Sequence, residues 1–262
     1  MVNTENKFNL PDSLEHEYEV YKLPTAYRKT LIIGDIHVPF HSISALTACI
    51  EFAKKEKVDS ILLNGDILDF YKLSKFTQDP FLVNFSDELK AGMDFFDALK
   101  KALPKAKIYY KIGNHEERLR TYLKTKAPEL FGLPTFDFTE FLQLGSRGIE
   151  FIDGNRIVLS GKLPILHGHE IRLGAGSVNP ARALYLKFKT SAAVSHLHRT
   201  SDHTESTGMG KTISTHSLGC LCELNPDYAP INNWNHGFAI NLVDSEGNYE
   251  FRNYKIVKGK VV

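Results

Sequence analysis

The sequence predicts an α/β fold, because two patterns of apolar residues follow one another along the chain. In the first half, short apolar runs such as "TLIIG" alternate with segments whose apolar residues recur at helical spacing. In the second half, apolar and polar residues alternate over short stretches, with a Gly turn between two of them, as in antiparallel strands. Alternating strands and helices imply parallel βαβ units in the first half, followed by a β-rich second half.

Three strands and three helices are expected in the first half. The apolar runs within 29–35, 58–66 and 106–116 predict the strands, and each run is short enough to be a single buried strand. Helical periodicity predicts helices over 42–57, 86–101 and 116–126, the first with Ser42 or Ser44 as its N-cap.

The second half predicts strands with one helix among them. Residues 156–169 read as a hairpin-like pair of strands, and 191–199 as another strand with a polar end. Asn179 followed by Pro180 provides an N-cap and a proline at the first helical position, so a helix is expected over 181–189. Residues 211–224 and 237–257 alternate like antiparallel strands. No repeat or Pro/Gly-rich linker divides the chain, so we expect one domain over 1–262, with 1–28 as an extension on its surface.

Composition and charge exclude several classes of protein. The formal net charge is +1, so no global field draws the chain to nucleic acid or to a membrane, and any polyanion must bind locally. The three cysteines, Cys49, Cys220 and Cys222, are too few and too unevenly spaced for a disulfide framework, and we expect buried, reduced thiols. The chain has neither a signal-like apolar segment at its start nor an apolar run of membrane length, so a cytoplasmic protein without a membrane partner is expected.

Polar side chains of a restricted kind follow five of the expected strands. They occur in "GDIH", "NGD", "GNHE", "LHGH" and "SHLH". Ligands of open α/β sheets bind beyond the carboxyl ends of the strands, so these groups are expected to meet in one crevice. The candidate metal ligands are Asp35, His37, Asp66, Asn114, His167, His196 and His198. Each motif alone also fits a turn, a helix cap or a buried histidine pair, but seven oxygen and imidazole donors suit two divalent ions that share a carboxylate.

The five motifs together resemble the calcineurin-like metallophosphoesterase superfamily over about residues 29–200. The resemblance implies a four-layer αββα sandwich of two mixed β-sheets flanked by helices, with the β-rich tail 201–262 completing the second sheet. It implies one metal held by Asp35, His37 and His198, and a second metal held by Asn114, His167 and His196. Asp66 would bridge two divalent ions, with Mn²⁺ favoured and Fe, Zn²⁺, Ni²⁺ or Mg²⁺ as alternatives. A hydroxide between the metals would be the nucleophile. Ser195 departs from the pattern, which usually has Gly before the last His-x-His.

The same resemblance assigns a proton-transfer role to His115. This histidine would protonate the leaving group, and a neighbouring carboxylate would orient its ring. Asp69, three residues after Asp66, is the first candidate for that carboxylate, and Glu116 is the second.

Two departures from the patterns of the superfamily argue against two of its branches, the protein Ser/Thr phosphatases and the purple acid phosphatases. Three hypotheses about activity remain. Phe70 follows Asp69 where protein Ser/Thr phosphatases carry an Arg, and Asp69 itself stands where purple acid phosphatases need a Tyr. A phosphodiesterase, of nuclease type if its partner is nucleic acid, is favoured over a phosphomonoesterase acting on nucleotides or phosphoproteins. A non-catalytic phosphate-binding scaffold is the third hypothesis. Candidate substrate-binding residues are Arg118, His41 and His169, and a solvated helix face remains the alternative for Arg118.

Overall fold

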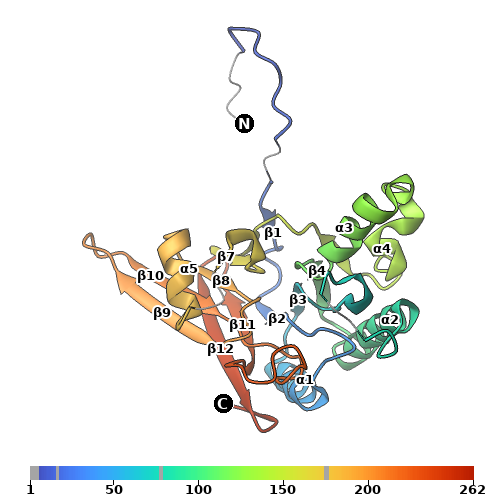
Figure 1. Ribbon diagram of the computed structural model, residues 1–262. Helices are drawn as coiled ribbons and strands as arrows, with labels where there is room; N and C mark the ends of the chain where they lie inside the picture. Colours follow the sequence, from blue (N-terminus) through green and yellow to red (C-terminus); the bar gives the residue numbers. More distant parts are fainter. Residues whose placement is uncertain (1–5, 16–17, 77–78, 174–176) are drawn as a thin grey trace.

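The structure, a computed structural model, describes residues 6–15, 18–76, 79–173 and 177–262. In these ranges the chain forms two mixed β-sheets that face each other, with helices on their outer faces (Figure 1). This arrangement confirms the predicted α/β four-layer sandwich.

The larger sheet has seven strands in the order β13-β12-β11-β2-β3-β4-β5. Its bounds are β2 (Lys29–Ile33), β3 (Ser60–Asn64), β4 (Lys107–Lys111), β5 (Glu150–Ile152), β11 (His236–Val243), β12 (Tyr249–Val257) and β13 (Lys260–Val261). Strands β2 to β5 are parallel, and Leu62 of β3 lies beside Ile32 on one side and Tyr109 on the other. Because these strands are parallel, the loops that carry the predicted ligands leave the sheet at the same edge.

The smaller sheet has six strands in the order β1-β6-β7-β8-β10-β9. Its bounds are β1 (Tyr21–Lys22), β6 (Val158–Ser160), β7 (Leu163–Leu166), β8 (Ala192–Val194), β9 (Ser201–Ser206) and β10 (Thr212–Ser217). Strands β6 and β7 form the predicted antiparallel pair, and β7 and β8 are parallel. The loops that follow β7 and β8 therefore also leave at one edge.

Helices cover the outer face of each sheet. They are α1 (Ile43–Glu56), α2 (Phe85–Ala102), α3 (Glu117–Lys126) and α4 (Phe138–Phe141) beside the larger sheet, and α5 (Pro180–Phe188) beside the smaller one (Figure 1). Short 3-10 helices are η1 (Tyr71–Leu73), η2 (Pro128–Leu130), η3 (Pro134–Phe136) and η4 (His169–Ile171). Asn179 caps α5 as predicted, its side chain accepting from the amide of Arg182 at 3.0 Å. Ser42 precedes α1 without a side-chain cap bond. Within the described residues no helix is long and apolar enough to cross a bilayer.

The apolar runs of β2 and β3 are continuous because both of their faces are buried. Ile32 and Leu62 face the smaller sheet, where they pack with residues such as Ile165. Their neighbours Leu31 and Leu63 face the opposite way, into the cluster formed with the helices. Side chains alternate between the faces of a strand, so a strand buried on both sides shows no polar alternation.

The expectation that the whole tail 201–262 completes the second sheet is wrong, because the tail is divided between the two sheets. β9 and β10 do join the smaller sheet, and β10 pairs parallel to β8. The hairpin β11–β12 and strand β13 instead extend the larger sheet, with Ala239 of β11 opposite Ile32 of β2. The alternation in the sequence marks these strands correctly but does not identify their partner. β11 covers an edge of β2 that would otherwise present unpaired backbone groups.

Candidate metal centre

The predicted ligands converge at the point where the strand-end loops of the two sheets meet. Loops after β2, β3 and β4 carry four of them from the larger sheet, and loops after β7 and β8 carry three from the smaller sheet. The seven residues are Asp35, His37, Asp66, Asn114, His167, His196 and His198. Two groups of donor atoms form, as described below.

The first group joins Asp35, His37 and His198. Nε2 of His198 lies 3.3 Å from Nε2 of His37 and 3.2 Å from Oδ1 of Asp35. All three residues are buried. Asp35, His37 and Asp66 also offer ligand atoms within 4.8 Å of one another. Asp66 therefore lies at the border of this group.

The second group joins Asp66, Asn114, His167 and His196. Nε2 of His167 lies 3.3 Å from Oδ2 of Asp66 and 3.2 Å from Oδ1 of Asn114. Ligand atoms of Asp66, His167 and His196 lie within 4.8 Å of one another. Asp66 is the one predicted ligand that these distances place in both groups, which is the position a bridging carboxylate requires.

The backbone at several candidate ligands adopts a left-handed conformation that residues other than glycine rarely take. Asp35, His37, Asp66, His196 and His198 all have φ between 52° and 68°. Such left-handed residues carry a cost of order 1–3 kcal/mol each, and they cluster at functional sites where surrounding contacts hold them. Backbone bonds hold them here: the amide of Asp35 donates to Gly65 at 3.0 Å, and that of His37 to Asp66 at 3.0 Å.

Charges in the two groups are arranged in acid–imidazole pairs. Burial alone would raise the pKa of Asp35 and Asp66, but His198 and His167 outweigh burial and lower both values. Conversely, burial lowers the pKa of His167 and His198, while Asp66 and Asp35 raise each to about 10. Protons on these imidazoles balance the buried carboxylates, and a divalent cation would replace them as the counter-charge.

Three observations indicate that these residues are suited to hold two divalent cations. The donors are carboxylate, amide and imidazole, the set that suits Mn²⁺, Fe and Zn²⁺. Oδ1 of Asp35 is buried and has no hydrogen-bond partner among the described residues, although Nε2 of His198 lies 3.2 Å from it as an ion-pair partner. A Cβ at Gly65 would overlap the ring of His167, so only glycine lets that ring approach the Asp66 loop. We conclude that the pocket is shaped around these donors.

His115 lies beside the groups and contacts Asp69 and Arg118. Its Nδ1 is 2.9 Å from the backbone carbonyl of Asp69 and 3.5 Å from that residue's Oδ2. Its Nε2 is 2.9 Å from Nη2 of Arg118 and 3.8 Å from Oδ2 of Asp66. Because Arg donates only, Nε2 accepts here and Nδ1 donates to Asp69. Burial lowers the His115 pKa, but Asp66 and Asp69 outweigh it and raise the pKa overall.

Asp69 also contacts a predicted ligand, since its Oδ2 is 3.2 Å from Nδ1 of His37. Of the two residues whose carboxylates were expected to orient His115, Asp69 lies against the ring, but its backbone carbonyl lies nearer to Nδ1 than its carboxylate does. Glu116 turns the other way. Its buried carboxylate accepts from the backbone amides of Asp66, Ile67, Leu68 and Gly113 and from the hydroxyl of Tyr110, at 2.7–3.2 Å. Glu116 thus holds the "NGD" and "GNHE" loops together.

A buried ion pair that the sequence patterns do not predict lies behind the second group. Nζ of Lys111 lies 2.7 Å from Oε1 of Glu170 and also donates to the carbonyl of Gly154. Glu170 in turn accepts from the amides of His167 and Gly168, at 3.2 and 2.7 Å. The pair therefore fixes the backbone of the "LHGH" loop. A lysine at the end of an otherwise apolar strand, "YYK", was the available signal.

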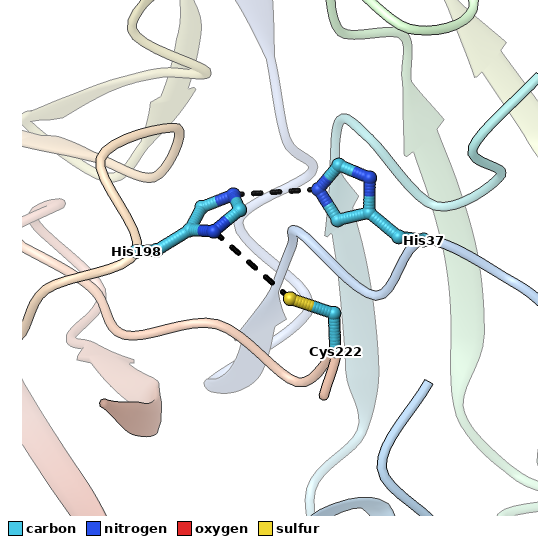
Figure 2. A group of neighbouring side chains, drawn as sticks. All are labelled: His37, His198 and Cys222. Atoms are coloured by element: carbon cyan, nitrogen blue, oxygen red, sulfur yellow. Dashed lines mark hydrogen bonds between the residues drawn. The ribbon is translucent and has the colours of Figure 1, made fainter. Parts of the chain in front are cut away.

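Cys222 and Trp234 surround His198, as Figure 2 shows for the cysteine. One ring nitrogen of His198 faces His37, and the other, Nδ1, lies 4.0 Å from Sγ of Cys222. The Trp234 ring packs edge-on, 4.1 Å from the imidazole centroid. Cys222 is buried and free, like Cys49 and Cys220, as predicted, and it lies against a candidate ligand. A partner on the second nitrogen fixes the tautomer of a ligating histidine.

The three candidate substrate residues lie in different places. Arg118 reaches the centre, as described, instead of lying on a solvated face. His169 lies near it, with its ring centroid 5.3 Å from that of His167. His41 pairs through its backbone with Cys222, and its buried Nδ1 has no hydrogen-bond partner in the described part of the chain. Ser195, at the family's usual glycine position, accepts from Nδ2 of Asn64 at 2.9 Å, so the departure is accommodated.

The chain matches one family model and is similar to several known proteins. The family model described as calcineurin-like phosphoesterase matches residues 28–218. Gene 54 protein of Mycobacterium phage L5 is 24% identical over 233 residues, which cover 84% of this chain and 90% of the phage protein. Among solved structures, a dimetal phosphatase from Danio rerio is 11% identical with a TM-score of 0.46, covering 90% of this chain and 98% of that one. Vacuolar Protein Sorting 29 from Cryptosporidium parvum is 14% identical with a TM-score of 0.46, covering 90% and 95%.

Proposed function

Because the chain belongs to the calcineurin-like phosphoesterase family, we propose that it is a dinuclear metal-dependent hydrolase of phosphodiesters. The observation that carries the proposal is the pair of donor groups that share Asp66, with His115 beside them. Two divalent ions on a shared carboxylate are a common arrangement for displacement at phosphorus.

The ligand assignment follows the two groups. Asp35, His37 and His198 would hold one ion, and Asn114, His167 and His196 the other, with Asp66 common to both. We take Mn²⁺ as the first choice because every donor is an oxygen or an imidazole nitrogen. When bound, the two ions would supply Lewis acidity toward phosphate oxygens and acidify coordinated water.

The remaining chemistry belongs to three residues of the chain itself. The backbone carbonyl of Asp69 holds the Nδ1 side of His115, which leaves Nε2 to face the site and to give a proton to the leaving oxygen. Arg118 now donates to that nitrogen, and a phosphate oxygen is a stronger acceptor for its guanidinium. A bound substrate would therefore draw Arg118 away, and Nε2 would then take up a proton from water, which the raised pKa of His115 favours.

A diester is favoured over a monoester because the site is open beyond Arg118. A groove of about 670 Å³ continues from Asn114 and Arg118. A second ester substituent fits there, whereas a monoester would leave the groove unused. Hydrolysis of nucleotide or phosphoprotein monoesters is the alternative outcome of the test below.

The test measures bis(p-nitrophenyl) phosphate and p-nitrophenyl phosphate turnover after metal removal and reloading with Mn²⁺. We expect the diester to be the better substrate, with loss of at least about 100-fold in Asp66→Asn. For His115→Ala we expect a loss of about 100-fold or more on esters with poor leaving groups and a small loss on the activated nitrophenyl esters.

Lys101→Gln, on the exposed end of α2, is the matched control and should keep full activity. Full diesterase activity in Asp66→Asn would refute the shared-carboxylate mechanism. Equal losses on activated and poor leaving groups in His115→Ala would remove its role as the acid.

A further inference from the structure

A groove beside the metal centre lies between the segment 72–76, which begins in η1, and helix α3. Its volume is about 670 Å³. Asn114 and Arg118 line it and also belong to the metal centre, so the two sites are continuous. The size is that of a site for a ligand of a few linked groups.

Basic side chains line this groove in excess over acidic ones. They are Lys72, Lys75, Arg118 and Lys126. Arg118 is paired with Oδ1 of Asp69 at 3.4 Å. Within the described residues, no carboxylate lies in ion-pair contact with any of the three lysines, although Nζ of Lys72 donates to the carbonyl of Asp79. Glu117, the acid of the groove, is engaged by Arg120 at 3.5 Å. A chain with a net charge of +1 thus concentrates positive potential next to its metal centre.

Two exposed aromatic rings accompany these charges. Phe76 is 69% exposed and Tyr122 is 44% exposed, although both are large apolar rings. Nζ of Lys75 lies 5.5 Å from the centre of the Phe76 ring. On α3, Arg118, Tyr122 and Lys126 recur every four residues and so lie along one helix face. Charge and ring alternate along the groove wall.

We propose that this groove binds a single-stranded nucleic acid, whose backbone leads one phosphodiester into the metal centre. The inference rests on the proposed function and specifies its substrate. The lysines neutralise successive phosphates, and the rings of Phe76 and Tyr122 stack on unpaired bases. A duplex keeps the faces of its bases stacked within itself, and a phosphopeptide has no bases, so neither uses both features.

The test measures binding without catalysis. Metal-free protein in EDTA is titrated into fluorescein-labelled oligothymidylate, and anisotropy gives Kd at several salt concentrations. Lys75→Glu/Lys126→Glu should weaken binding at least about tenfold and reduce the salt slope by about 1.4, because each phosphate contact on a single strand contributes about 0.7. Tyr122→Ala should weaken binding about fivefold or more, and Tyr122→Phe should retain it.

The matched control is Lys54→Glu/Lys101→Glu, which makes the same charge change at exposed positions in the last turns of α1 and α2. These turns lead toward the amino ends of β3 and β4, opposite the edge that carries the metal centre. The control should bind like the wild-type chain, and thermal unfolding checks that each variant is folded.

Unchanged Kd in the groove variants would overturn the inference, as would tighter binding of a duplex or of a phosphoserine peptide than of the single strand. Wild-type turnover of bis(p-nitrophenyl) phosphate tests the proposed function separately. A wild-type chain that hydrolyses this small diester while the groove variants bind oligonucleotide normally would refute the groove alone.

Discussion

Replacing Glu116 tests whether the last residue of "GNHE" organises the site from behind. The carboxylate is 1% exposed and accepts from four backbone amides and the Tyr110 hydroxyl. In Glu116→Ala these donors lose their partner while buried, and an unsatisfied buried donor costs about 1–3 kcal/mol. Water entering the cavity can satisfy some of them, so we expect a loss of about 3–5 kcal/mol in the free energy of unfolding.

Glu116→Gln separates hydrogen bonding from volume. One oxygen remains to accept, but the new NH₂ meets amides that also donate, so we expect a loss of about 1–3 kcal/mol. Urea unfolding of metal-free protein measures both variants, and their m-values should match the wild type. Mn²⁺ affinity should also fall, because the amides of Asp66 and Gly113 are among the donors released.

Glu117→Gln is the matched control, since Glu117 is the neighbour of Glu116 and the first residue of α3, but it pairs with Arg120 near the surface. It should change the unfolding free energy by less than about 1 kcal/mol. If Glu116→Ala were as stable as this control, the carboxylate would not hold the two loops, and the reasoning would be refuted.

Two further predictions concern groups behind the ligands. The charge of Lys111 outweighs burial and lowers the pKa of Glu170 from 4.5 to about 2. The ionised Glu170 therefore contributes about 3 kcal/mol to the free energy of unfolding above pH 4.5, and this contribution is lost as the pH falls toward 2. The stability difference between wild type and Glu170→Gln, from urea unfolding in EDTA, should shrink over that interval, and a constant difference would contradict the assignment. Cys222→Ala should weaken Mn²⁺ binding about tenfold by releasing Nδ1 of His198. Fluorescence of Trp234, the only tryptophan, reports the titration, and equal affinities for Cys222→Ala and Cys220→Ala would argue against it.

Local patterns in the sequence were sufficient to predict the alternating strands and helices and the polar motifs at the strand ends. The four layers and the division of the candidate ligands into two groups were predicted from the resemblance to the family. Continuous apolar runs marked strands buried on both faces, and short polar motifs followed them at fixed offsets. Parallel pairing then brings Asp35, Asp66 and Asn114 to one edge without further information. The partner of β11 could not be predicted in this way, because an alternating strand fits either sheet equally well.

Residues that support the ligands could not be predicted, since each acts on a segment far from it in sequence. Lys111 bonds to Glu170 across 59 positions, and Cys222 lies 24 positions from His198. Asn64 connects to Ser195 across 131 positions. The spacing of apolar residues along the sequence does not indicate such long-range pairs. The one signal in the sequence was Lys111, a charged residue at the end of a largely apolar strand, and this signal does not identify the residue with which Lys111 pairs.

The "GNHE" stretch shows how one motif serves two purposes on opposite sides of a single turn. Asn114 and His115 face the metal centre, where they contact His167 and Asp69. Glu116 faces away and binds backbone amides of the neighbouring loop. The residues of the motif therefore serve different physical purposes. The loss of activity and the loss of stability should be separable by experiment. Replacing His115 should lower activity on esters with poor leaving groups in a protein that stays stable, whereas replacing Glu116 should lower stability first and activity as its consequence.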